Sequence, residues 1–289
     1  MKSAKAKGIG FILLAALCFA SMSMFVRLAG ELPTMEKAVF RNAVAMVIAL
    51  VILLKDHTEL SVPRESRKFV WLRVICGTIG LVCNFYAIGK INLADANMLN
   101  KLSPFFVLIF SALFLHEKMK LSQILLIAGA FCGSLLIIKP SAGNMLLIPS
   151  LIGALGGVAA GAAYACARGA TTHGAPKTVV VLAFSAFSTF SLLPLALARF
   201  VMPSAQQLIC LVLCGVCGAG GQFAITSAYA CAPASEISVY DYSQVIFSAI
   251  LGFFVFDQKP DALSVCGYVI IISLAVLNSY WNNRHERRA

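Results

Sequence analysis

The sequence has few charged residues for its length. Asp, Glu, Lys and Arg make up 12% of the 289 residues, and only 12 side chains are acidic, whereas soluble proteins carry about 25% charged residues. So little charge excludes an ordinary soluble domain, which needs a hydrated surface around its core. Hydrophobic residues make up 60% of the chain, and its mean hydropathy is +0.88. These values predict an integral membrane protein.

The motifs of common enzymes are also missing. No glycine-rich loop ends in Lys-Ser or Lys-Thr, so the chain lacks the phosphate-binding loop of ATP-driven pumps. It has neither a Gly-x-Ser-x-Gly elbow nor a His-Glu-x-x-His zinc motif. Cys210, Cys214 and Cys217 share a helical face, but no His or carboxylate joins them at ligand spacing. We therefore expect no enzyme activity, no cofactor and no metal site.

Long apolar runs dominate what is present. A membrane-spanning helix needs about 20 apolar residues, and ten such runs are separated by charges or by Pro and Gly. Their ranges are 8–28, 34–54, 69–89, 93–115, 121–139, 149–168, 177–199, 206–229, 235–256 and 262–281. No connector between them is long enough to fold alone. The sequence predicts an all-α membrane protein with ten transmembrane helices.

Lys and Arg are distributed unevenly among the connectors. If the N-terminus is cytoplasmic, most of them fall on the cytoplasmic side, including Arg64, Arg67, Lys68 and Arg73. The positive-inside rule then places both termini in the cytoplasm. This orientation signal accounts for the formal net charge of +11, so we expect no nucleic-acid partner. The compact chain is typical of a bacterial inner membrane.

The two halves of the sequence resemble each other. Gly77 and Gly215 lie 138 residues apart in matching Cys-Gly pairs. We expect residues 1–140 and 141–289 to form two repeats of five helices each. Because five is odd, the second repeat would be inverted in the membrane relative to the first. Inverted repeats are typical of secondary transporters, which bind substrate near the midplane between the halves.

Few ionisable residues fall inside the expected spans. Such a group costs about 2.5–3.5 kcal/mol at mid-helix on insertion scales, and it usually faces a cavity or a partner. Lys101 and Asp241 occupy matching positions, 140 residues apart. They can hold the two ends of a zwitterionic substrate, or they can neutralise each other as a structural pair. Asp241 and Glu236 are also candidates for binding a coupling proton, since burial favours a neutral carboxyl group.

Other polar residues surround these positions. Asn97 lies on the same helical face as Lys101, and Pro104 frees a main-chain carbonyl that needs a cavity or a side-chain partner. Asn84 and Gln222 correspond to each other and can contact substrate or bridge helices. Arg41 can face the cavity or extend to the outer surface.

The repeat ends resemble a known superfamily. The stretches Ser103-Pro104 to Glu117 and Tyr242-Ser243-Gln244 to Asp257, with Phe40-Arg41-Asn42, are similar to the EamA family of the drug/metabolite transporter superfamily. The resemblance covers essentially the whole chain. It implies ten helices around a central cavity and alternation between inward-open and outward-open states. The expected substrate-binding residues are Asn84, Asn97, Asn100, Lys101, Tyr164, Gln222, Tyr240, Asp241, Gln244 and Arg41.

The predicted function is secondary transport of a small polar or zwitterionic metabolite, such as an amino acid, an amino-acid derivative or an S-adenosylmethionine-like compound. A non-transporting membrane sensor or assembly protein on the same fold is the main alternative, and a lipid-modifying membrane enzyme is a weaker one. The expected partners are the substrate and the lipid bilayer, with proton coupling as an option. Both a monomer and a homodimer are compatible with the sequence.

Overall fold

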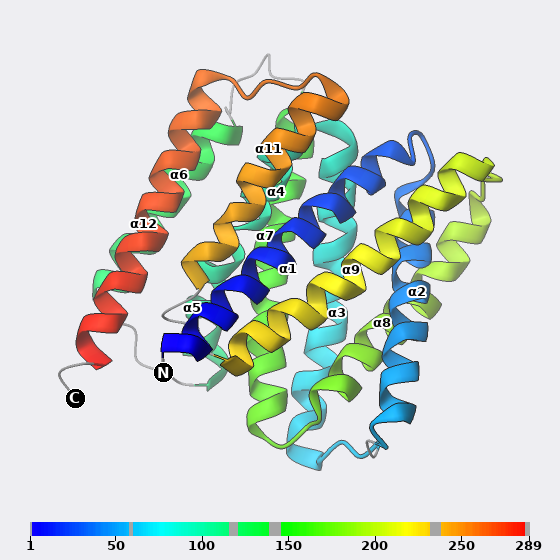
Figure 1. Cartoon of the computed structure of the whole chain (residues 1–289), viewed down its shortest axis with the longest axis horizontal. Coiled ribbons are helices and arrows are strands. Elements are labelled where there is room, and N and C mark those ends of the chain that lie inside the picture. Colours follow the sequence, from blue (N-terminus) through cyan, green and yellow to red (C-terminus); the bar gives the residue numbers. More distant parts are fainter. Residues whose placement is uncertain (1, 58–59, 116–120, 139–145, 232–237, 287–289) are drawn as a thin grey trace.

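In the computed structural model, residues 2–57, 60–115, 121–138, 146–231 and 238–286 are described, and they form helices with short connections and no strand (Figure 1). The elements are α1 (Lys2–Leu28), α2 (Thr34–Lys55), α3 (Arg64–Lys90), α4 (Leu93–Asn100), α5 (Ser103–Leu115), α6 (Leu121–Ile138), α7 (Leu147–Thr172), α8 (Lys177–Ala198), α9 (Ala205–Cys231), the 3-10 helix η1 (Ser238–Tyr242), α11 (Ser243–Phe256) and α12 (Ala262–Glu286). The predicted all-α class is confirmed.

The helices fall on the ten predicted apolar runs. Among the described residues, α1, α2, α3, α7, α8 and α9 are long and apolar enough to cross a membrane. Shorter apolar helices occupy Ile124–Ile138, Tyr240–Phe256 and Ala262–Leu274. The run at 93–115 differs from the prediction, because it is two helices, α4 and α5, separated at Lys101 and Leu102.

The outer surface of the bundle is apolar. On α2, Val47, Val51 and Leu54 lie three and four residues apart and are all more than half exposed, while Ala45 and Ala49 on the opposite side are buried. An apolar stripe of this kind normally faces a protein core. Large exposed apolar surfaces mark contact with another partner or with lipid. Polar side chains such as those of Asn42, Asn97 and Lys101 are instead buried, as expected where the hydrocarbon of a bilayer surrounds the fold.

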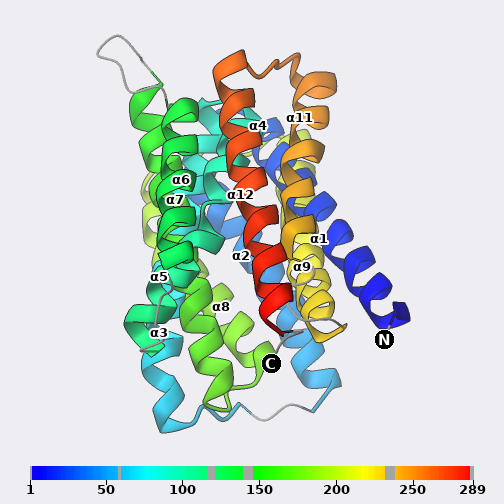
Figure 2. The ribbon, with the colours of Figure 1, turned by 90° about the vertical axis from the view of Figure 1, so that its left-hand side faces the viewer.

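The core lies between the two halves of the chain. Helix α1 packs on α9, α3 packs on α7, and α2 packs on α8. Helix α12 runs beside α6 at one side of the bundle, as Figures 1 and 2 show from two directions. The first helix of each half thus packs on the third helix of the other half, so both halves contribute to the interior.

Small residues of α7 allow close packing around the break between α4 and α5. A Cβ atom on Gly157 would lie 2.4 Å from the carbonyl oxygen of Leu99, and one on Gly161 would lie 2.5 Å from Cβ of Phe106. Real Cβ contacts are longer than this, so only glycine allows the approach. The break in the first half is therefore held against α7 by main-chain contact.

Candidate functional site

The helix changes at matching positions in the two halves. Helix α4 gives way to α5 at Ser103, and η1 gives way to α11 at Ser243, 140 residues later. Pro104 cannot donate a main-chain hydrogen bond to α4, which favours the first interruption. The hydroxyl of Tyr242 donates a hydrogen bond of 3.1 Å to the carbonyl oxygen of Lys101. A side chain from the second half therefore satisfies the main chain at the break in the first half, as non-helical backbone inside a membrane protein requires.

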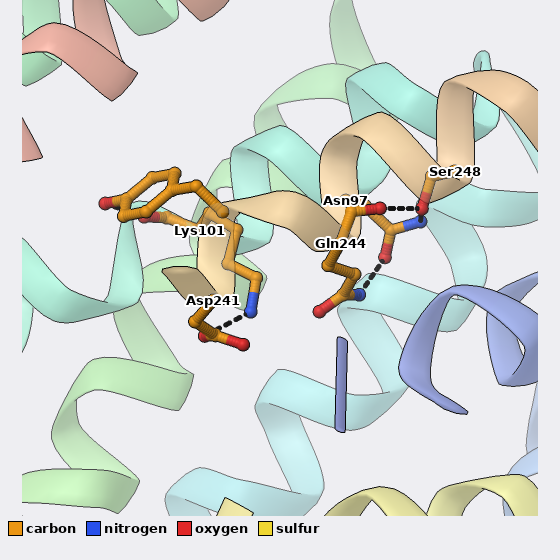
Figure 3. Close-up of polar contacts among 6 residues, drawn as sticks. Asn97, Lys101, Asp241, Gln244 and Ser248 are labelled. Carbon is orange, nitrogen blue, oxygen red and sulfur yellow. Dashed lines mark hydrogen bonds and ion pairs between the residues drawn. The ribbon is translucent and has the colours of Figure 1, made fainter. Parts of the chain in front are cut away.

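Lys101 and Asp241 form a buried ion pair close to the junctions of α4 with α5 and of η1 with α11. The Lys101 Nζ atom lies 2.5 Å from Asp241 Oδ2, and the two side chains are 8% and 13% exposed. Figure 3 shows the ammonium group directed at the carboxylate. The other carboxylate oxygen, Oδ1, is buried and makes no hydrogen bond to a residue that the structure describes. The pair thus joins the two halves while leaving one acceptor atom unused.

Asn97 is the centre of a second polar cluster. Its Oδ1 atom accepts hydrogen bonds from Ser23 (3.0 Å) and Gln244 (2.8 Å), and its Nδ2 donates to the Leu93 carbonyl (2.9 Å) and to Ser248 (3.1 Å). Figure 3 shows the contacts to Gln244 and Ser248. All four side chains are buried. The amide of Asn97 therefore fixes α4 against α1 and α11.

Two buried arginines form a third polar group. Arg41 on α2 is 3% exposed and Arg73 on α3 is 6% exposed. The aromatic ring of Phe184 on α8 contacts both, with its centroid 5.9 Å from the Arg41 guanidinium carbon and 4.2 Å from that of Arg73. Arg41 also donates to Asn42 Oδ1 at 2.7 Å. Since Arg41 is buried, it does not extend to the outer surface.

A small hollow separates these side chains. Its volume is about 10 Å³, close to what one water molecule needs. Helices α2, α3, α8 and α9 line it, and its polar members are Arg41, Arg73, Ser185 and Gln222. In the conformation described, this hollow is too small for a metabolite.

The remaining predicted site residues lie in different surroundings. Tyr164 on α7 is 41% exposed although it lies within the helix. Asn84 is buried with its Oδ1 atom unpartnered. The structure places Tyr240 at an exposed position and Asn100 at a half-buried one, and Glu236 lies outside the described residues.

Sequence reasoning missed several residues of these clusters. Arg73 was interpreted only as an orientation signal, yet it lies inside the third predicted span, and this position was the available clue. Ser23 and Ser248 are small hydroxyl residues of a kind that occurs throughout apolar helices, so the sequence gave no signal for them. Phe184 is one of 20 Phe residues, and only its contacts distinguish it.

Comparison with known proteins identifies the family. The model of the EamA-like transporter family matches residues 6–139 and 147–280. A pseudopaline exporter, CntI, of Pseudomonas aeruginosa strain UCBPP-PA14 is 33% identical over 268 residues, which cover 92% of this chain and 93% of the exporter. A riboflavin transporter of Vibrio cholerae is 28% identical, over 98% of this chain and 96% of that protein.

A solved crystal structure shares the fold. It superposes with a TM-score of 0.66 over 97% of this chain and 99% of that chain, at 18% sequence identity. The relatives are named as transporters rather than enzymes, and the apolar helices place this protein in the bacterial inner membrane as a multi-pass protein. The resemblance seen in the sequence is confirmed: the chain belongs to the EamA-like transporter family.

Proposed function

We propose that this transporter is a secondary carrier of a small polar or zwitterionic metabolite and works by alternating access through a central cavity. The observation that carries the proposal is the buried Lys101–Asp241 pair. It lies where α4 gives way to α5 and where η1 gives way to α11, and secondary transporters bind substrate near the midplane at discontinuous helices. An amino acid or an amino-acid derivative has the matching pair of charges.

The architecture that accompanies this function is ten transmembrane helices with both termini in the cytoplasm. Residues 1–140 and 141–289 form the two inverted repeats. The change from one helix to the next at Ser103 and Ser243 and the reciprocal packing of the first and third helices of each half support this arrangement. In such a fold, one half can rock against the other around a fixed site.

The substrate replaces the contact between Lys101 and Asp241 with its own contacts to each residue. Without substrate, each charge of the pair neutralises the other. When substrate enters, its carboxylate takes the place of Asp241 beside Lys101, and its ammonium group takes the place of Lys101 beside Asp241. Removing either residue alone would leave a buried, unpaired charge, which is strongly unfavourable. The exchange leaves no charge unpaired, so the same two residues can stabilise the empty carrier and bind its substrate.

Coupling to protons is assigned to Asp241, with Glu236 as a second candidate. The unpartnered Oδ1 atom of Asp241 is an available site for a proton. Protonation would weaken the pair with Lys101 and open it to substrate, and release of the proton would restore the carboxylate that pairs with the substrate's ammonium group. Coupling predicts that transport of substrate is accompanied by movement of protons in a fixed ratio.

The test begins with purified protein in detergent. Thermal unfolding is measured with amino acids, amino-acid derivatives, S-adenosylmethionine and riboflavin, since a ligand that binds the folded state raises the melting temperature. We then expect the stabilising compound to exchange across proteoliposome membranes with the wild type, and the Asp241→Asn variant to lose this exchange. Normal exchange by a folded Asp241→Asn variant would refute the assigned site.

A non-transporting sensor on the same fold would bind ligand without changing sides. A cysteine introduced at Tyr164, in a chain whose native cysteines are replaced, separates the two functions. A transporter exposes this position to impermeant maleimide from each side of the membrane in turn, and substrate shifts the balance. Labelling from one side only, whatever the ligand, would favour the sensor.

A further inference from the structure

We infer that Arg41 and Arg73, with Ser185, form an oxyanion subsite at the hollow between α2, α3, α8 and α9. The substrate would then carry a carboxylate or phosphate group in addition to its zwitterionic part. This inference rests on the proposed transport function and specifies its substrate class.

The first argument is charge. Among the described residues, no carboxylate lies within 4.0 Å of the Arg41 or Arg73 guanidinium group. Both side chains are more than nine-tenths buried. Buried charges are normally paired, because an unpaired charge loses its hydration without compensation. Two such cations around one hollow are a strong indication that an anion binds there.

The second argument is unused hydrogen-bonding capacity. The Nε atom of Arg41 and the hydroxyl of Ser185 are buried and make no hydrogen bond to any described residue, and both residues line the hollow. Buried polar groups rarely lack a partner in folded proteins, and each such exception needs an explanation. An oxyanion accepts from several donors at once, and arginine binds carboxylate and phosphate with two parallel hydrogen bonds. One bound group would therefore satisfy the donors of both arginines and of Ser185.

The third argument is the space reserved for the two guanidinium groups. A Cβ atom on Gly77 would lie 2.1 Å from Arg73 Nη1, and one on Gly218 would lie 2.9 Å from Arg41 Nε. Glycine at both positions leaves room for the guanidinium groups beside the helix backbone. The ring of Phe184 lies between them and supports both through cation–π contact. The arginines are thus held at the hollow by their surroundings.

The hollow itself is the closed form of the subsite. At about 10 Å³ it admits about one water molecule, so an oxyanion enters only when the surrounding helices part. The lining comes from α2 and α3 of the first half and α8 and α9 of the second half. Movement of one half against the other, as alternating access requires, would open it.

The subsite also determines the sign of the substrate charge. Lys101 and Asp241 cancel each other, whereas Arg41 and Arg73 together leave two positive charges in the interior. A neutral zwitterion would leave both arginines unpaired. The preferred substrate therefore has more anionic than cationic groups.

The binding test uses inorganic phosphate and citrate as probes on the purified protein, with chloride at matched ionic strength as the reference. We expect saturable thermal stabilisation by at least one of the two oxyanions and a loss of affinity of tenfold or more in both Arg73→Gln and Arg41→Gln. The matched control is Arg67→Gln, because Arg67 is an exposed arginine on the same helix as Arg73. This control should keep the wild-type affinity.

The two oxyanions distinguish the chemistry of the bound group, since citrate alone indicates a carboxylate and phosphate alone indicates a phosphate ester. If Arg73→Gln does not fold, Ser185→Ala removes one donor without removing a charge and should weaken binding severalfold. Absence of saturable stabilisation in the wild type, or equal affinity in the glutamine variants and the Arg67→Gln control, would overturn the inference.

Failure of the subsite and failure of the transport proposal give different results. If Asp241→Asn abolishes exchange while Arg73→Gln binds oxyanions like the wild type, the carrier stands and the subsite is wrong. If oxyanion binding depends on both arginines but no stabilising compound crosses proteoliposome membranes, the subsite stands and the transport proposal is wrong.

Discussion

The hydroxyl of Tyr242 lies 3.1 Å from the main-chain carbonyl oxygen of Lys101 and donates a hydrogen bond to it. The acceptor is in the first half of the chain, at the end of α4, and the donor is in the second half, at the end of η1. The ends of α4 and η1 are therefore joined twice, through this main-chain contact and through the Lys101–Asp241 pair. Either tie can be removed separately.

Replacing Tyr242 by Phe should lower the free energy of unfolding by about 1 kcal/mol. The change removes one hydroxyl and leaves the Lys101 carbonyl without this donor, and a hydrogen bond of this kind contributes about 0.5–1.5 kcal/mol. Denaturant unfolding in detergent measures the effect. The matched control is Tyr86→Phe, since the half-buried Tyr86 hydroxyl makes no hydrogen bond within the part of the chain that the structure describes. Equal losses in the two variants would show that the Tyr242 contact is not stabilising.

Single removal of Lys101 or Asp241 should be more harmful than removal of both. Lys101→Ala leaves a buried carboxylate and Asp241→Ala leaves a buried ammonium group, and breaking such a pair costs about 3–5 kcal/mol. The double variant leaves no charge behind and should recover part of that loss. A double-mutant cycle on unfolding free energies measures the coupling. If the losses simply add, the two side chains do not stabilise each other.

Asn97→Ala should destabilise the protein by about 1–3 kcal/mol, because it leaves buried donors or acceptors of Ser23, Gln244 and Ser248 without their partner. Asn100→Ala, at a half-buried position three residues away, should have a much smaller effect. Thermal unfolding of both variants makes the comparison. A larger loss for Asn100→Ala would mean that the Asn97 cluster does not hold α4 in place.

Gly157→Ala should impair both stability and transport. The added Cβ would lie 2.4 Å from the Leu99 carbonyl oxygen, so α7 must move away from the helix break, and overpacking of this kind costs about 1–3 kcal/mol. The control is Gly89→Ala, where a Cβ meets no atom within 4 Å. Melting temperature and exchange rate in proteoliposomes are the measurements, and a control as impaired as Gly157→Ala would contradict the packing argument.

Helix positions were predictable because apolar length is a strong signal in a membrane protein. The expected run at 34–54 differs from α2 by a single residue at its end. The division at Lys101 and Leu102 was harder to anticipate, because the residues on both sides favour helix and only Pro104 weakens it. The position of that break depends on contacts with α7 and Tyr242, which no local pattern contains.

The candidate site was predictable by residue type and depth, but the partners of each residue were not. Helical spacing placed Asn97 and Lys101 on one face, yet in the structure Asn97 bonds to Gln244, and Lys101 bonds to Asp241. The reading of Arg73 as an orientation signal ignored its depth in the helix. Helical periodicity predicts on which face of a helix a side chain lies. The packing of the other helices determines which residue that side chain contacts.

The neutral Lys101–Asp241 pair has a consequence for the response to membrane voltage. Moving one elementary charge through a potential of 100 mV involves about 2.3 kcal/mol, but a pair that moves as a unit carries no net charge. The electric field therefore does no net work on this pair when the empty carrier reorients. Arg41 and Arg73 have no carboxylate partner among the described residues, so we expect both to contribute to the voltage dependence of reorientation.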